Sequence, residues 1–239
     1  MEYFLAGVIM FFATTLQGIS GFGSGLVAVP ILALWFPLTT LTPSLSVINI
    51  FVAALLYWKN RQAARPWQWK WLILAGVIAS LVAGSLLVNI NEQALKFALG
   101  LLIVVVALIL ASGRQLPTAE HTLGHLGVGT GAGILNGLMT LAGPPIVLFL
   151  ANARLPKVQF RATLSLFFCS IAIANVVNFS RQGLYDFHHG YLILILLPSA
   201  LLGAALGQRL QHHVSEHRFR QLTIGLMLLS GIIVSLQSL

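Results

Sequence analysis

Charged side chains are scarce in this sequence of 239 residues, where Asp, Glu, Lys and Arg together make up 8%. A soluble domain carries about 25% charged residues. The chain is instead 58% hydrophobic, with a mean hydropathy of +0.92. Too little polar surface remains to cover a water-soluble globule, so the composition predicts a polytopic membrane protein made of helices.

Acidic residues and cysteine are both scarce. The five acids are Glu2, Glu92, Glu120, Asp186 and Glu216, and each lies at the end of an apolar segment or near the terminus. A carboxylate relay for protons in the middle of the membrane is therefore not expected. The single cysteine, Cys169, excludes an internal disulfide framework and is interpreted as a packing residue.

Sequence signatures for catalysis and cofactor binding are missing as well. We find no P-loop, HExxH, GxSxG or kinase motif and no metal-ligand spacing, so we expect neither an enzyme nor a cofactor or metal site. The formal net charge of +8 comes from basic residues in short loops between apolar segments. This distribution favours the lipid bilayer as a partner and argues against nucleic acid.

Eight apolar segments can be recognised, at residues 3–36, 41–58, 70–89, 93–112, 121–152, 160–179, 190–208 and 217–238. Six of them have the length of one membrane-spanning helix, about 17–22 residues. Segments 3–36 and 121–152 are too long for one crossing and are interrupted by glycines near Gly21–Gly25 and Gly143. We predict that each forms two short helices joined by a break at mid-membrane depth, the second helix beginning near Ser24 or Gly143.

The first half of the chain is repeated in the second. The stretch from Gln17 to Gly25 corresponds to the stretch from Asn136 to Pro144, about 119 residues later. We therefore divide the chain into repeats at residues 1–113 and 114–239, each with one glycine-broken hairpin and three spanning helices. If both hairpins are re-entrant, Lys96 and Arg181 lie on one side and the other 11 basic residues on the opposite side. Since basic loops face the cytoplasm, we predict inverted repeats with both termini outside it.

Broken helices place free backbone N–H groups and a partial positive charge at mid-membrane, which suits an anion. The candidate substrate-binding residues are Gln17, Ser20, Gly21, Gly23, Ser24, Gly25, Asn49, Asn136, Thr140, Ala142, Gly143, Thr163 and Asn175. The alternative is that the glycines merely let helices pack closely. Arg161 is either a snorkelling anchor, which we favour, or a cation facing the substrate.

Three stretches carry a resemblance to a known family: Gly18 to Pro30, Gly137 to Val147, and Phe160 to Ser165. They resemble the glycine-rich segment, its Gly-Pro-Pro variant and the Phe-Arg-Ala-Thr segment of the TauE/SafE sulfite-exporter family. The resemblance covers essentially the whole chain as two matched repeats. It implies a small bacterial-type permease for sulfur-containing or organic anions. Thr140 and Ala142 depart from the glycine-rich pattern.

The expected function is a secondary transporter of the inner membrane. Its substrate would be a small anion, sulfite or an organosulfonate, with proton co-transport left open. Two alternatives remain from the sequence: a passive anion channel, and a non-catalytic membrane subunit of a larger complex.

Overall fold

The computed structural model describes residues 2–112, 122–153 and 155–211, and all regular structure in these ranges is helical. The helices are α1 (Glu2–Ser20), α2 (Ser24–Leu32), α3 (Leu38–Asn60), α4 (Lys70–Leu86), α5 (Glu92–Ser112), α6 (Thr122–Met139), α7 (Gly143–Asn152), α8 (Lys157–Arg181) and α9 (Phe187–Leu210). Short 3-10 turns η1 (Arg61–Ala63), η2 (Pro66–Trp69) and η3 (Leu87–Asn89) flank α4. The segment predicted at 217–238 and the repeat junction near residue 114 lie outside the described residues.

Within the described residues, five helical stretches are long and apolar enough to cross a membrane: Glu2–Ser20, Leu38–Ala63, Pro66–Asn89, Lys157–Arg181 and Phe187–Leu210. The described part of the chain therefore has the architecture of an all-helical membrane protein. One expectation is wrong, because α1 is not a short helix. It has 19 residues, about 28 Å at 1.5 Å per residue, because the helix continues through Gly18 and ends only at the turn around Gly21. Likewise α6 has 18 residues. Only the second helix of each broken segment is short, α2 with 9 residues and α7 with 10.

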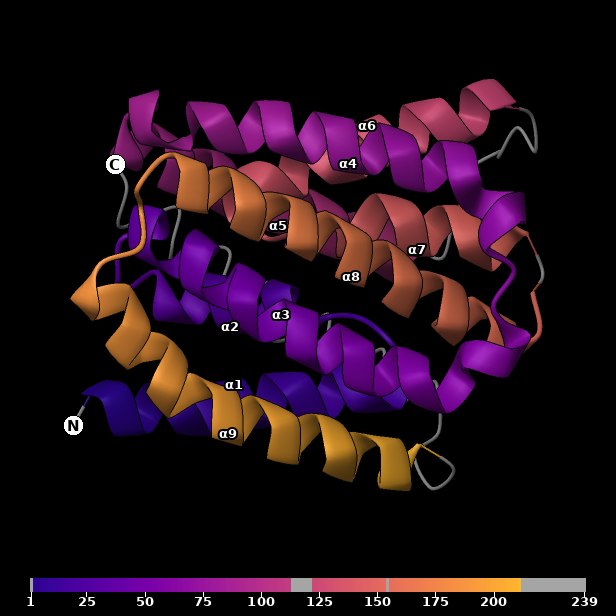
Figure 1. Cartoon of the computed structure of the whole chain (residues 1–239), viewed down its shortest axis with the longest axis horizontal. Helices are drawn as coiled ribbons and strands as arrows, with labels where there is room; N and C mark the ends of the chain where they lie inside the picture. Colours follow the sequence, from indigo (N-terminus) through magenta and orange to yellow (C-terminus); the bar gives the residue numbers. More distant parts are fainter. Residues whose placement is uncertain (1, 113–121, 154, 212–239) are drawn as a thin grey trace.

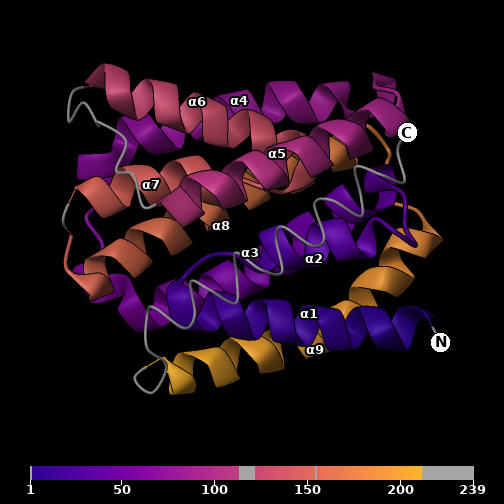
Figure 2. The same ribbon diagram turned by 180° about the vertical axis from the view of Figure 1, so that it is seen from behind.

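Two pairs of parallel helices form the flanks of the molecule (Figure 1): α1 lies beside α9 on one flank, and α6 lies beside α4 on the other. Glycines allow both contacts. A Cβ atom on Gly18 would lie 2.5 Å from the carbonyl oxygen of Ala204, and one on Gly137 would lie 2.5 Å from that of Ser80. The backbones thus touch directly, as small residues permit in membranes. Helices α3 and α8 run between the pairs, as the view from behind also shows (Figure 2).

Each broken segment starts and finishes at the same end of the molecule. The ring of Tyr3 in α1 lies 5.6 Å from that of Phe36, which follows α2. The ring of His125 in α6 lies 5.4 Å from that of Phe149 in α7. These two aromatic contacts are at opposite ends, because the first lies near the start of α3 and the second near Trp69, which follows the end of α3.

Candidate functional site

The break between α1 and α2 depends on glycine conformations. Gly21 has φ +90° and Gly23 has φ +105°, values in the left-handed region that only glycine adopts at little cost. Ser20 closes this turn, since its hydroxyl lies 2.9 Å from the carbonyl oxygen of Leu16 and 2.6 Å from that of Phe22. The hydroxyl of Ser20 therefore forms its hydrogen bonds within the break and stabilises the turn.

The break between α6 and α7 has the same form at matched positions. Thr140, which stands 119 residues after Gly21, is the one non-glycine residue with positive φ in the described chain, at +57°. A β-branched residue adopts this conformation only when its surroundings impose it. Helix α7 then begins at Gly143 with proline in its first turn, where the missing N–H costs nothing.

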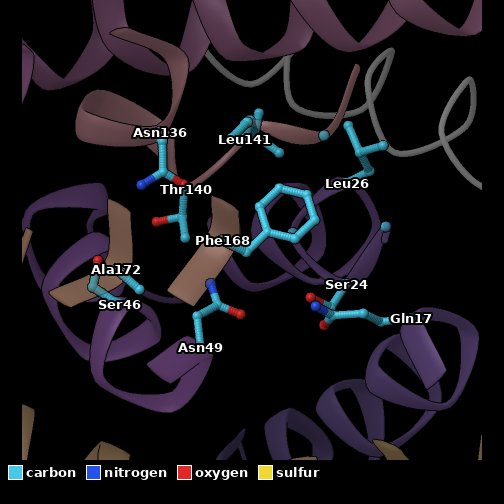
Figure 3. A pocket seen from close by; sticks show the side chains of 14 residues that line it. Gln17, Ser24, Leu26, Ser46, Asn49, Asn136, Thr140, Leu141, Phe168 and Ala172 are labelled. Carbon is cyan, nitrogen blue, oxygen red and sulfur yellow. The ribbon is translucent and has the colours of Figure 1, made fainter. Parts of the chain in front are cut away.

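A cavity of about 30 Å³ lies between the two breaks (Figure 3). Its lining comes from α1, α2, α3, α6, α7 and α8: Gln17, Gly23, Ser24, Gly25, Leu26, Ser46, Asn49, Asn136, Thr140, Leu141, Ala142, Gly143, Phe168 and Ala172. Figure 3 shows Gln17 and Ser24 on one side, Thr140 on the other, and the ring of Phe168 between them. Both short helices, α2 and α7, therefore direct their N-terminal turns at one polar cavity.

Two polar atoms at this cavity have no protein partner among the described residues. They are Oε1 of Gln17, whose residue is 3% exposed, and Oγ1 of Thr140, whose residue is 6% exposed. A buried polar atom without a hydrogen bond is destabilising. Water or a small ligand in the cavity can supply the missing partner, since a water needs only about 10–15 Å³.

The structure brings together nine of the thirteen predicted site residues at this cavity, and the remaining four lie elsewhere. Ser20 is held within its turn, and Gly21 packs against the side chain of Arg161. Thr163 is buried with its hydroxyl unpaired, but it does not line the cavity. Asn175 accepts a hydrogen bond from Ser80 (2.7 Å) and donates one to the Asn136 carbonyl (3.4 Å), so it ties α8 to α4 and α6.

Five lining residues were not among the predicted ones: Leu26, Ser46, Leu141, Phe168 and Ala172. For two of them the sequence held a signal. Ser46 stands three residues before Asn49, which places the two on one face of a helix. Phe168 stands 119 residues after Asn49, so the repeat itself relates it to a predicted site residue. No local polarity marks a phenylalanine as a binding residue, which explains why the pattern of polar side chains missed it.

Arg161 is buried rather than a snorkelling anchor. The residue is 9% exposed, and its Nη2 donates a hydrogen bond to the carbonyl oxygen of Gly18. The anchor interpretation is therefore wrong, because the side chain turns toward the break between α1 and α2 instead of reaching the membrane surface. Arg161 contacts this break without lining the cavity.

Comparison with known proteins gives the family. A model of the family "Sulfite exporter TauE/SafE" matches residues 6–234. This chain belongs to the TauE/SafE family. The resemblance of its glycine-rich segments is thereby confirmed, and the chain is a membrane transporter of that family.

One curated relative of this chain is the "Probable inner membrane transporter protein TsaS" of Comamonas testosteroni. It is 26% identical to this chain over 176 residues, which cover 69% of this chain and 72% of the relative. No solved structure matches the chain. For this TauE/SafE member, the substrate and the binding site must therefore be argued from its own residues.

Proposed function

We propose that this chain is a secondary transporter of a small anion, sulfite or an organosulfonate, bound in the cavity between α2 and α7. One observation carries the proposal: two short helices begin at the same buried cavity. The first N–H groups of a helix have no intrahelical partner, and the helix dipole adds about half a positive charge at that end. An anion at this cavity would accept hydrogen bonds from the first N–H groups of α2 and from the N–H of Gly143 in α7, since Pro144 and Pro145 have no N–H to donate.

The side chains around the cavity support a small oxyanion. Ser24, Asn49 and Asn136 each offer a hydroxyl or amide donor from a different helix. No carboxylate lines the cavity. The lining therefore carries no full negative charge that would repel an anion, and the donors match the oxygen atoms of a sulfite or sulfonate group.

The arrangement of helices supports two inverted repeats. The breaks recur with a spacing of 119 residues, and the two broken segments enter from opposite ends of the molecule. The contact of α1 with α9 corresponds to the contact of α6 with α4, since each pairs a broken segment with a helix of the other repeat. Transport would proceed by rocking one group of helices against the other around the cavity.

The basic residues support an orientation in the inner membrane. The described elements at the end of the molecule that holds Trp69 are the end of α3 with η1 and η2, the starts of α4 and α8, and the end of α9. They carry Lys59, Arg61, Arg65, Lys70, Lys157 and Arg209. The opposite end includes the start of α5 and the end of α8, which carry Lys96 and Arg181. Because short basic loops stay in the cytoplasm, the Trp69 end would be cytoplasmic and both chain termini would lie outside the cytoplasm.

Flux measurements in proteoliposomes test the proposal. Labelled sulfite, sulfoacetate and sulfate would be offered to the purified full chain with and without a pH gradient. We expect saturable uptake and counterflow of one sulfur anion. Thr140→Val should reduce it by about 10-fold or more, because a hydrogen bond to a charged group contributes about 1.5–3 kcal/mol. Ser44→Ala, which removes an unpaired buried hydroxyl away from the cavity, should leave it within about 2-fold.

Other outcomes would point to the alternatives. Flux without saturation or counterflow would indicate a passive anion channel. No flux above that of empty vesicles, from protein shown to be folded, would contradict transport of these anions by the chain alone. That result would favour a subunit of a larger complex.

A further inference from the structure

A broken helix presents two opposite dipole ends at its break. The N-terminal end of α2 is partly positive, but the C-terminal end of α1, only a few residues away, is partly negative by a similar amount. At equal distance the two ends nearly cancel. Attraction of an anion to this break therefore requires something that offsets the negative end of α1.

Arg161 contacts that negative end. Its Nη2 donates to the carbonyl oxygen of Gly18, in the last turn of α1. A Cβ atom on Gly21 would lie 3.2 Å from Cγ of Arg161, so the arginine stem packs against the break itself. Arg161 therefore lies inside the molecule, where the residue is more than nine-tenths buried.

The charge of Arg161 is not neutralised by the described residues. The two ion pairs in the described chain join Lys96 to Glu92 and His189 to Asp186, and neither includes Arg161. Its Nε is buried and has no hydrogen-bond partner there. A buried cation without a partner is costly, and an anion bound nearby would reduce that cost.

The second break has a neutral group at the matched position. Thr42 stands 119 residues before Arg161, and its hydroxyl donates to the carbonyl oxygen of Leu138 (3.2 Å) in the last turn of α6. Thr42 thus satisfies one carbonyl at the end of α6 in the way Arg161 does at the end of α1. The two breaks differ by one full positive charge.

We infer that Arg161 sets the charge selectivity of the site by offsetting the negative end of α1, so that the cavity prefers a monoanion over a neutral molecule of the same shape. This inference rests on the proposed function and adds the residue that gives the site its charge. Arg161 acts through the break and is a positioning residue. A charge inside the molecule is screened less than one in water, so Arg161 can act on the cavity without lining it.

Methanesulfonate and methanesulfonamide test the inference, because they have nearly the same shape and differ by one charge. Apparent dissociation constants would be obtained from the ligand-dependent melting temperature of the purified full chain. We expect the wild type to bind methanesulfonate at least about 10-fold more tightly than the sulfonamide. Arg161→Gln should bring the ratio to within about 2-fold of 1, whereas Arg161→Lys, which keeps the charge, should retain most of it.

Thr42→Val serves as the matched control and should keep the wild-type ratio, since it removes a neutral donor at the other break. If Arg161→Gln weakens both ligands equally and leaves the ratio unchanged, Arg161 is only structural and the inference fails. If Arg161→Gln does not fold, loss of the ratio in folded Arg161→Lys would overturn the inference instead. A wild type that binds neither ligand, nor sulfite in the same assay, would overturn the proposed function and the inference with it.

Discussion

Gly25 and Gly143 both lie in the first turn of a short helix, yet their surroundings differ. A Cβ atom on Gly25 would lie 2.5 Å from the carbonyl oxygen of Thr140, in the backbone of the other break. A Cβ atom on Gly143 would meet only the side chains of Leu26 and Phe22, at 3.7 and 3.9 Å. Gly25 is therefore the residue at which the two breaks touch, and Gly143 has room for a methyl group.

This difference predicts that one added methyl group destabilises the fold at Gly25 and has little effect at Gly143. Gly25→Ala should lower the free energy of unfolding by about 1–3 kcal/mol, as overpacking does, because the two breaks must separate. Gly143→Ala should stay within about 0.5 kcal/mol of the wild type. Thermal unfolding of the purified chain in detergent, followed by tryptophan fluorescence, measures both. Equal stability of the two variants would contradict direct contact between the breaks.

At the scale of elements, the start of α9 depends on a capping box outside the apolar segments. The carboxylate of Asp186 accepts a hydrogen bond from the backbone N–H of His189 (3.0 Å) and lies 2.6 Å from its Nδ1. The backbone hydrogen bond from His189, followed by its side-chain hydrogen bond, lowers the pKa of Asp186 to about 2. The ionised carboxylate thus caps the helix that packs beside α1.

The cap should make part of the stability depend on pH. The pKa of Asp186 is lower in the folded chain than its ordinary value of 3.8. The carboxylate therefore stabilises the fold fully above about pH 5, and this contribution is lost as the pH falls through 4 toward 2. We expect Asp186→Ala to melt a few degrees below the wild type at pH 7, and the difference to shrink at pH 3. A difference that is the same at both pH values would rule out the charged cap, whereas Glu92→Gln should show no comparable loss at pH 7.

At the scale of the whole molecule, the proposed orientation in the membrane can be tested at two exposed glutamines. The start of α4, with Gln68 just before it, lies at the end of the molecule where His125, near the start of α6, contacts Phe149, near the end of α7. The start of α5, with Gln93 in its first turn, lies at the opposite end, since α4 runs between them. Both glutamines are exposed, so in the proposed orientation they would lie on opposite sides of the membrane.

Cysteine labelling in cells checks this orientation. In a Cys169→Ser background, Gln93→Cys should react with a membrane-impermeant maleimide in intact cells. Gln68→Cys should react only after the membrane is permeabilised. The reverse pattern would place the basic end outside and contradict the orientation, and equal reactivity in intact cells would contradict opposite sides altogether.

Composition and spacing were sufficient for the class of protein and for much of the cavity. Scarce charge and long apolar segments predicted a helical membrane protein, because backbone groups in lipid must be satisfied within helices. The spacing of 119 residues located both breaks, since a helix ends where glycines and a Gly-Pro-Pro sequence replace helix-forming residues. Gln17, Ser24, Asn136 and Thr140 could therefore be named as lining residues from the repeat alone.

The tertiary structure decided which side chains of different helices contact one another, because the spacing of residues along the chain carries no information about those contacts. Whether Arg161 reaches the surface or the end of α1 depends on where the start of α8 lies relative to Gly18, which stands 143 residues earlier in the sequence. Asn175 links α8 to α4 instead of lining the cavity, because its side-chain oxygen accepts a hydrogen bond from Ser80 of α4. Phe168 lines the cavity because α8 passes beside the cavity at this residue. A sequence pattern records which face of a helix is polar, and only the packing of helices decides what that face meets.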